Sequence, residues 1–185
     1  MRNDTFSIYD GNARGEMSKR LAALLGSARN APIFVCIGSD RVTGDCLGPL
    51  VGHLLVTRHN IGTYVYGTLE CPITALNLEE SRGFILNAHP GRKVVAVDAA
   101  LGGSGDVGAI RVRRGAIKPG AAVDKNLPEI GDVGITAVVG STDFPAREQL
   151  VATRLHFVLR LAELIAVAAA DCIEWKKPHK LSMTR

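Results

Sequence analysis

The run KVVAVD at residues 93–98 constrains the fold more than any other feature of the sequence. Its four central residues are apolar, three of them are valines, and an acid ends the run. Valines favour a strand, and a strand that is apolar on both faces has to be covered on both faces by other elements. The run therefore predicts a central strand of a parallel sheet that carries helices on both sides.

Patterns elsewhere in the chain supply the remaining strands and the covering helices. Apolar runs predict strands near residues 32–37, 63–67, 109–113 and 135–139, and the alternation in AIRVR at 109–113 is typical of an edge strand. Helical spacing predicts helices near residues 15–25, 48–59, 74–88 and 145–174. Alternating strands and helices predict a three-layer α/β/α sandwich with a mainly parallel sheet. The 185 residues fit one domain, with residues 1–14 and 176–185 expected to be flexible ends.

The charge distribution argues against a nucleic-acid binder. The formal net charge is +4, and most of it comes from four basic residues in the last part of the chain, Lys176, Lys177, Lys180 and Arg185. A protein that binds nucleic acid usually carries a basic stripe on its folded body, and the sequence contains none outside this tail. We therefore expect no nucleic-acid partner.

The cysteines and the apolar segments indicate a cytoplasmic protein. Four cysteines occur without a CxxC pair, which is typical of a reducing compartment. Residues 1–16 lack the apolar core of a signal peptide, and Glu163 and Asp171 interrupt the most apolar stretch, near residues 161–173. We therefore expect no membrane partner.

Acidic residues lie near the ends of three expected strands, where ligands bind in open α/β sheets. Asp40 and Asp45 lie in the loop after the first strand, Glu70 follows the second, and Asp98 ends the central strand. The loop lacks the GxGxxG and P-loop patterns, so no nucleotide cofactor is expected. The sequence has no GxSxG motif and no histidine at an expected strand end, which argues against a serine or cysteine triad.

The chemistry of two neighbouring carboxyl groups suits hydrolysis. At a separation of about 5 Å and an effective dielectric constant near 20, two carboxylates repel by about 3 kcal/mol, which raises one pKa by about two units. One group can then hold a proton while the other activates water. For either acid alone a structural role is the better interpretation, with Asp45 capping the following helix and Asp98 anchoring a loop.

Several motifs resemble a known family. The loop CIGSDRVTGDCLGPLVG at 36–52 resembles that of YyaC-type sporulation proteins, and its TGDCLGP core is similar to a TPDALGP-like segment of the germination protease. The segments GTLECPITALNL at 67–78 and LPEIGDVGITAVV at 127–139 also resemble the YyaC type. The run VVAVDAA at 94–100 resembles the second acid-bearing strand of the germination protease. The resemblance covers about residues 30–170.

This resemblance implies a phosphorylase/hydrolase-like fold, shared with germination proteases and hydrogenase maturation endopeptidases. It implies Asp45 and Asp98 as catalytic residues and a sporulation-associated endopeptidase acting on a protein or peptide in the cytoplasm of a spore-forming cell or forespore. Residues expected to support the site or bind substrate are Ser39, Asp40, Cys46 and Glu70. Cys46 stands where hydrogenase peptidases have a metal-binding acid, so no metal and no cofactor are expected.

Other interpretations remain open. A catalytically silent binding or regulatory sporulation protein could keep the same fold, and a metal-sensing maturation peptidase would use similar positions. Cys46 and Cys71, on adjacent loops, could form a soft-metal cluster with Asp45. The apolar circumference of the last helix, including Leu161 and Ile165, also predicts a homodimer.

Overall fold

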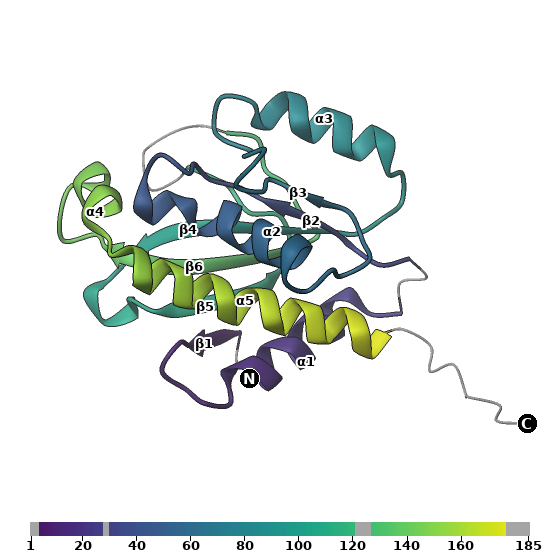
Figure 1. The fold of residues 1–185 in the computed structure, drawn as a ribbon, viewed down its shortest axis with the longest axis horizontal. Helices are drawn as coiled ribbons and strands as arrows, with labels where there is room; N and C mark the ends of the chain where they lie inside the picture. Colours follow the sequence, from purple (N-terminus) through teal and green to yellow (C-terminus); the bar gives the residue numbers. More distant parts are fainter. Residues whose placement is uncertain (1–3, 28–29, 121–126, 177–185) are drawn as a thin grey trace, which may run out of the picture.

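The computed structural model of the chain describes residues 4–27, 30–120 and 127–176 (Figure 1). Its strands are β1 (Thr5–Ser7), β2 (Ile33–Cys36), β3 (Val65–Tyr66), β4 (Val94–Gly102), β5 (Ala109–Arg114) and β6 (Val133–Ser141). Its helices are α1 (Ala13–Leu25), α2 (Leu47–Thr57), α3 (Leu78–Ala88), α4 (Ala146–Ala152) and α5 (Leu155–Lys176), and two short 3-10 helices are η1 (Thr43–Cys46) and η2 (Ser104–Asp106). The strands form one sheet in the order β1-β5-β6-β4-β2-β3.

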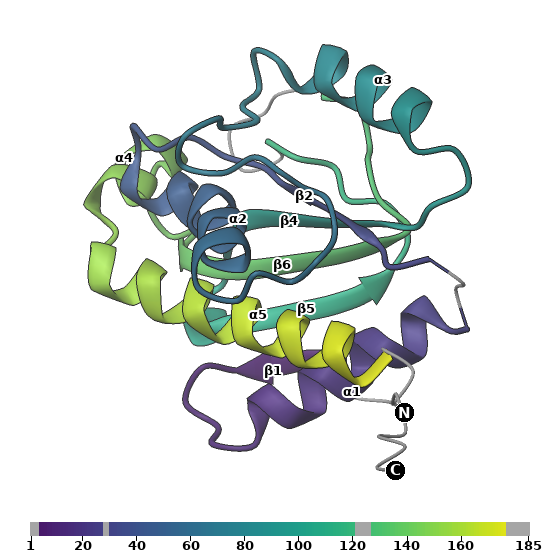
Figure 2. The ribbon, with the colours of Figure 1, turned by 45° about the vertical axis from the view of Figure 1, so that its right-hand side comes forward.

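Helices cover the two faces of this sheet unequally, as Figure 2 shows, with α3 on one side and α1, α2 and α5 on the other. Alternate residues of β4 enter two separate apolar clusters. Val95 and Val97 pack in the cluster that contains the α1, α2 and α5 residues, whereas Val94 and Ala96 pack in the cluster beneath α3. The sequence prediction of a central strand covered on both faces, and of a three-layer α/β/α sandwich, is confirmed.

The predicted position of residues 109–113 at an edge of the sheet is wrong. β5 lies between β6 and β1 and is antiparallel to both, because Thr5–Ser7 pairs along its outer side. Phe6 of β1 is opposite Ile110 and is buried in the core, and Asp4 forms an ion pair with Arg20 at 2.6 Å. Part of the segment expected to be a flexible end is therefore paired into the sheet.

The helix predicted for residues 145–174 is interrupted. Thr153 has extended backbone angles, φ −61° and ψ 132°, and separates α4 from α5. Its Oγ1 donates a hydrogen bond to the carbonyl oxygen of Gln149 at 2.7 Å. Leu150 of α4 packs directly against Gly44 of η1, whereas α5 packs against α1 and α2, so the two helices cover different parts of the molecule.

The apolar circumference of α5 is largely covered within the chain. Leu161, Ile165 and Ala168 are buried in the cluster formed with α1 and α2. These residues therefore have intrachain partners, and the homodimer stays a prediction. Among the described residues, no helix has the length and hydrophobicity needed to cross a bilayer.

Candidate active site

The site lies where β2 stops and its neighbour β4 continues. Cys36, the last residue of β2, pairs with Val97, so Asp98 is the first β4 residue beyond the end of β2. We expected β4 to end at Asp98, but it continues to Gly102 because β6 pairs with it as far as Ser141. Asp98 is therefore held inside a strand, on the sheet face that Val94 and Ala96 occupy beneath α3.

A tight loop after β2 positions the second acid. Gly38 has φ 143°, and a Cβ at this residue would overlap the carbonyl oxygen of Asp45. The Ser39 N–H donates a hydrogen bond to that oxygen at 3.2 Å, and the Asp45 N–H donates to the carbonyl of Val42 at 2.9 Å. These contacts fix the backbone of Asp45 within η1, one residue before its end.

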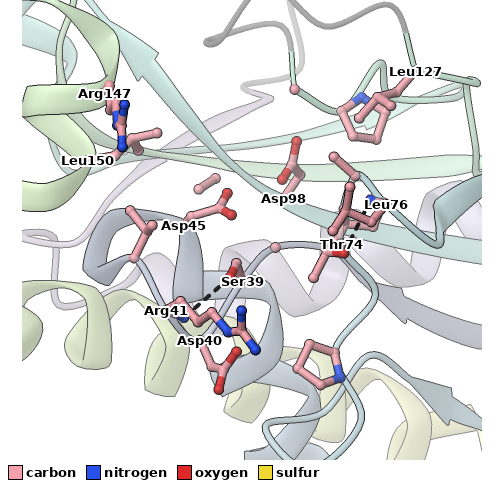
Figure 3. A pocket seen from close by; sticks show the side chains of 18 of the residues that line it. Ser39, Asp40, Arg41, Asp45, Thr74, Leu76, Asp98, Leu127, Arg147 and Leu150 are labelled. Atoms are coloured by element: carbon pink, nitrogen blue, oxygen red, sulfur yellow. Dashed lines mark hydrogen bonds between the residues drawn. The ribbon is translucent and has the colours of Figure 1, made fainter.

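Both carboxyl groups point into one cleft (Figure 3). The cleft has a volume of about 950 Å³ and is lined by η1, by β4 and by the loop that follows β3. Asp45 is partly exposed, whereas Asp98 is only 7% exposed. The two candidate catalytic residues are therefore brought to the same cleft by η1 and β4, and the volume of this cleft is in the range of ligand-binding sites.

Burial and charge set the protonation of Asp98. The pKa of Asp98 is raised to about 8, mainly because the carboxyl is buried and in addition because of the negative charge of Asp45. Backbone N–H groups of Ala99 and Gly120 donate hydrogen bonds to the carboxyl and oppose this shift. At neutral pH the carboxyl of Asp98 is consequently largely protonated, so it is available as a proton donor.

The other expected site residues lie in different places. Ser39, Asp40 and Glu70 line the cleft, and the Ser39 hydroxyl accepts a hydrogen bond from the Arg41 N–H at 3.2 Å, which stabilises the loop. Cys46 does not line the cleft. It is buried in the core, and its Sγ donates to the Thr43 carbonyl at 3.0 Å.

Cys46 and Cys71 do not form a soft-metal cluster with Asp45. Burial raises the pKa of the Cys46 thiol, and the neighbouring charges of Asp45 and Asp40 act in the same direction. Cys71 is exposed and does not line the cleft that contains Asp45. Within the described ranges no group of three His, Cys, Asp or Glu side chains is arranged to hold a metal ion.

Comparison with known proteins places the chain in a family. Residues 5–168 match the family model described as a protein of unknown function, DUF1256. The chain belongs to the DUF1256 family. The uncharacterized protein YyaC of Bacillus subtilis (strain 168) is 39% identical over 174 residues, which cover 92% of this chain and 85% of that protein. The sequence resemblance to the YyaC type is thus confirmed over most of this DUF1256 protein.

Residues of α4 also line the cleft of this DUF1256 protein, although they were not among the predicted site residues. Arg147 and Leu150 form one wall, and Leu76, which is 95% exposed, also lines the cleft. A signal for α4 was present in the sequence. Because β6 is parallel to β4, the segment after β6 has to emerge at the same edge of the sheet as the acid-bearing loops.

Proposed function

We propose that this protein is an endopeptidase that uses Asp45 and Asp98 as an acid–base pair. The observation that carries the proposal is the pairing of a buried carboxyl of raised pKa with a second carboxyl at the same open cleft. A protonated acid next to an ionised one is the division of labour on which carboxylate-dependent hydrolysis depends. Neither group alone carries the proposal, because single buried acids often have structural roles.

The proposed reaction needs one water molecule. The Asp45 carboxylate takes a proton from this water as its oxygen attacks the carbonyl carbon of the scissile peptide. Asp98 donates its proton to the nitrogen of the leaving amine as the carbon–nitrogen bond breaks. Asp45 then holds a proton and Asp98 is ionised, and proton exchange restores the starting state, with atoms and charges balanced.

The expected substrate is a protein segment in an extended conformation. Leu76, Leu127 and Leu150 give the cleft an apolar lining, which suits the side chains of a polypeptide. The resemblance to YyaC-type sporulation proteins and to the germination protease supports a sporulation or spore protein as the substrate. It also supports action in the cytoplasm of the spore-forming cell or forespore.

The test uses purified protein and extracts of spores. Wild-type protein should generate new protein termini that mass spectrometry detects, and Asp45→Asn and Asp98→Asn should each abolish most of them. The double variant should be little worse than either single one, because residues that act as a unit are not additive. Glu16→Gln, which changes an exposed acid of α1 outside the cleft, is the matched control and should keep most activity.

Three results would contradict the proposal. Normal cleavage by either single variant would exclude the acid pair. Loss of cleavage with a chelator, and recovery with zinc or nickel, would favour a metal-sensing maturation peptidase. Capture of a spore protein without any new terminus, under conditions in which the protein is folded, would favour a catalytically silent binding protein.

A further inference from the structure

A second cleft adjoins the candidate active site on the same side of the sheet. It has a volume of about 660 Å³ and lies over the part of β4, β6 and β5 that α3 does not cover. Asp98, Ala99 and Ala146 line both clefts, so the two meet at the proposed acid. A ligand that passes Asp98 in one cleft can therefore continue into the other.

Basic side chains dominate this second cleft. On β5, Ile110 and Val112 are buried toward α1 and α5, and Arg111 and Arg113 alternate with them, so the two arginines face the cleft. Arg114 and Lys118 complete the set of basic residues.

One of these cations has an internal partner. Arg111 forms an ion pair with Asp106 at 2.7 Å, whereas Arg113, Arg114 and Lys118 are exposed and have no acidic partner among the described residues. Asp98 is the one acidic residue that lines this cleft in the described part of the chain, and it is largely protonated at neutral pH.

The walls of the second cleft are built by the fold. A Cβ at Gly134 would overlap the Ile117 side chain, so the segment that carries Lys118 packs directly onto β6. Phe144, which is 61% exposed, lines the cleft as well. The arginines of the cleft are thus held by β5, and Lys118 is held by a segment that packs on the sheet.

The two clefts differ in charge. The first carries the acids Asp40, Asp45 and Glu70 beside the cations Arg41 and Arg147, whereas the second carries the unpaired cations described above. A nucleic acid has a negative charge at every phosphate, so it matches the second cleft but not the acids of the first. A polypeptide can place acidic side chains in one part of its length only, so it matches both clefts.

We propose that the second cleft binds an acidic segment of the polypeptide substrate, on one side of the bond that Asp45 and Asp98 face. Arg113 and Lys118 are the specificity-determining residues, because neither has an acidic partner among the described residues and Arg113, unlike its neighbour Arg114, is on the cleft face of β5 by strand alternation. The inference rests on the proposed peptidase function for the identity of the ligand. Binding can nevertheless be measured without cleavage.

The experiment measures binding by the full chain in the Asp45→Asn background, which prevents turnover. The probe is a fluorescent peptide with an apolar half and a half of consecutive Glu residues, and the control peptide has Gln in place of every Glu. Fluorescence anisotropy at low salt should show about fivefold tighter binding of the Glu peptide, the size expected for partly exposed charge pairs. Added salt should reduce this preference.

Variants identify the cleft that is responsible. Arg113→Gln/Lys118→Gln should abolish the preference for Glu over Gln, and its exposed positions should leave folding intact, which circular dichroism checks. Arg160→Gln is the matched control, because Arg160 is an exposed arginine on α5, across the sheet from the cleft. It should leave the preference unchanged.

The outcomes separate this inference from the proposed function. Equal binding of the two peptides, or a Glu preference that survives Arg113→Gln/Lys118→Gln, would overturn the acidic-segment site while leaving the peptidase proposal intact. Displacement of the Glu peptide by an oligonucleotide of equal charge would overturn it as well. Conversely, a Glu preference in a protein that cleaves nothing in spore extracts would refute the peptidase and retain the cleft as an acidic-peptide site.

Discussion

Asp98 is almost entirely buried, yet it borders two open clefts. Its carboxyl has lost most of its hydration while staying within reach of a ligand. Its ionised form is destabilised, because burial and the charge of Asp45 both disfavour a negative charge on this carboxyl. The residue is thus expected to weaken the fold under conditions in which it has to ionise.

The pH dependence of stability tests this expectation. Because the pKa of Asp98 is about 8 in the folded protein and about 4 when unfolded, the native state binds more protons between these values. The contribution of Asp98 to the free energy of unfolding should therefore fall as pH rises from about 4 to 8. Above pH 8, Asp98→Asn should be more stable than wild type by about 2–5 kcal/mol.

Denaturant unfolding at several pH values measures the effect. Near pH 4 the variant and wild type should be similar in stability, because Asp98 is then neutral in the folded protein. Asp132→Asn provides a comparison. Because Asp132 accepts a hydrogen bond from the Val94 N–H at 2.8 Å, the Asp132→Asn protein should be less stable than wild type. Parallel curves for wild type and Asp98→Asn from pH 4 to 9 would contradict the assignment.

Gly38 determines where Asp45 lies. Replacement by alanine would place a Cβ against the Asp45 carbonyl oxygen at a φ of 143° that side chains rarely adopt. Gly38→Ala should lower the free energy of unfolding by about 2 kcal/mol or more and reduce cleavage beyond the loss of folded protein. Thermal unfolding and activity assays on the same sample check both effects.

Gly83→Ala is the matched control for that substitution. Gly83 lies within α3, and a Cβ there would contact nothing within 4 Å, so alanine should stabilise the helix by about 0.5–1 kcal/mol. A Gly38→Ala protein that is as stable and active as wild type would show that the loop has another conformation.

At the scale of elements, the site depends on unequal strand lengths and on one short helix. β4 and β6 continue beyond the end of β2, so no residue of β2 pairs with Asp98. The short helix α4 then packs over η1. Leu150 is so close to Gly44 that a Cβ added at Gly44 would lie 2.9 Å from Leu150. α4 thereby holds the turn that carries Asp45.

Truncation of Leu150 tests the role of α4. Leu150→Ala should cost about 2–3 kcal/mol of stability by leaving a cavity, and it should lower kcat further because η1 loses its cover. Leu24→Ala, a buried residue of α1, should destabilise by a similar amount while the folded fraction keeps normal kcat. Equal kcat in the two variants would show that α4 does not position Asp45.

The elements show what the sequence could predict and what it could not. β4 was predictable because its valines pack on both faces of the sheet. The position of Asp45 in the loop after β2 was predictable from the TGDCLGP motif that contains it. β1 was not, because its three residues are too few to show alternation and gain their order by pairing with β5. The break at Thr153 also escaped, since the residues on both sides of it favour helix and tertiary packing decides.

At the scale of the whole molecule, the two layers of helices differ in how much of the sheet they cover. The α1, α2 and α5 layer carries most of the core, whereas the opposite face is covered only in part by α3. Both clefts lie on this less covered side. The position of Asp98 near the end of β2 could be predicted, but its burial and the basic cleft could not, because they depend on how β5 and residues 115–118 meet across the sheet.

The predicted homodimer concerns the outer surface of the molecule. The α5 residues that suggested it are buried within the chain, so a dimer would have to use other surfaces. Sedimentation at micromolar concentration should show a species of about twice 19.7 kDa if the prediction holds. A single 19.7 kDa species would contradict it.

The proposed function depends on the carboxyl pair, and a titration of Asp98 tests this pair most directly. Carbon-13 NMR of the aspartate carboxyl groups, with Asp98→Asn to assign the signal, should give a pKa of about 8 for Asp98 in the wild-type protein. Asp45→Asn should lower that pKa, while burial keeps it above the ordinary value of about 4. An Asp98 that titrates near 4, or whose pKa is the same with and without the Asp45 carboxyl, would contradict the claim that the two acids act together.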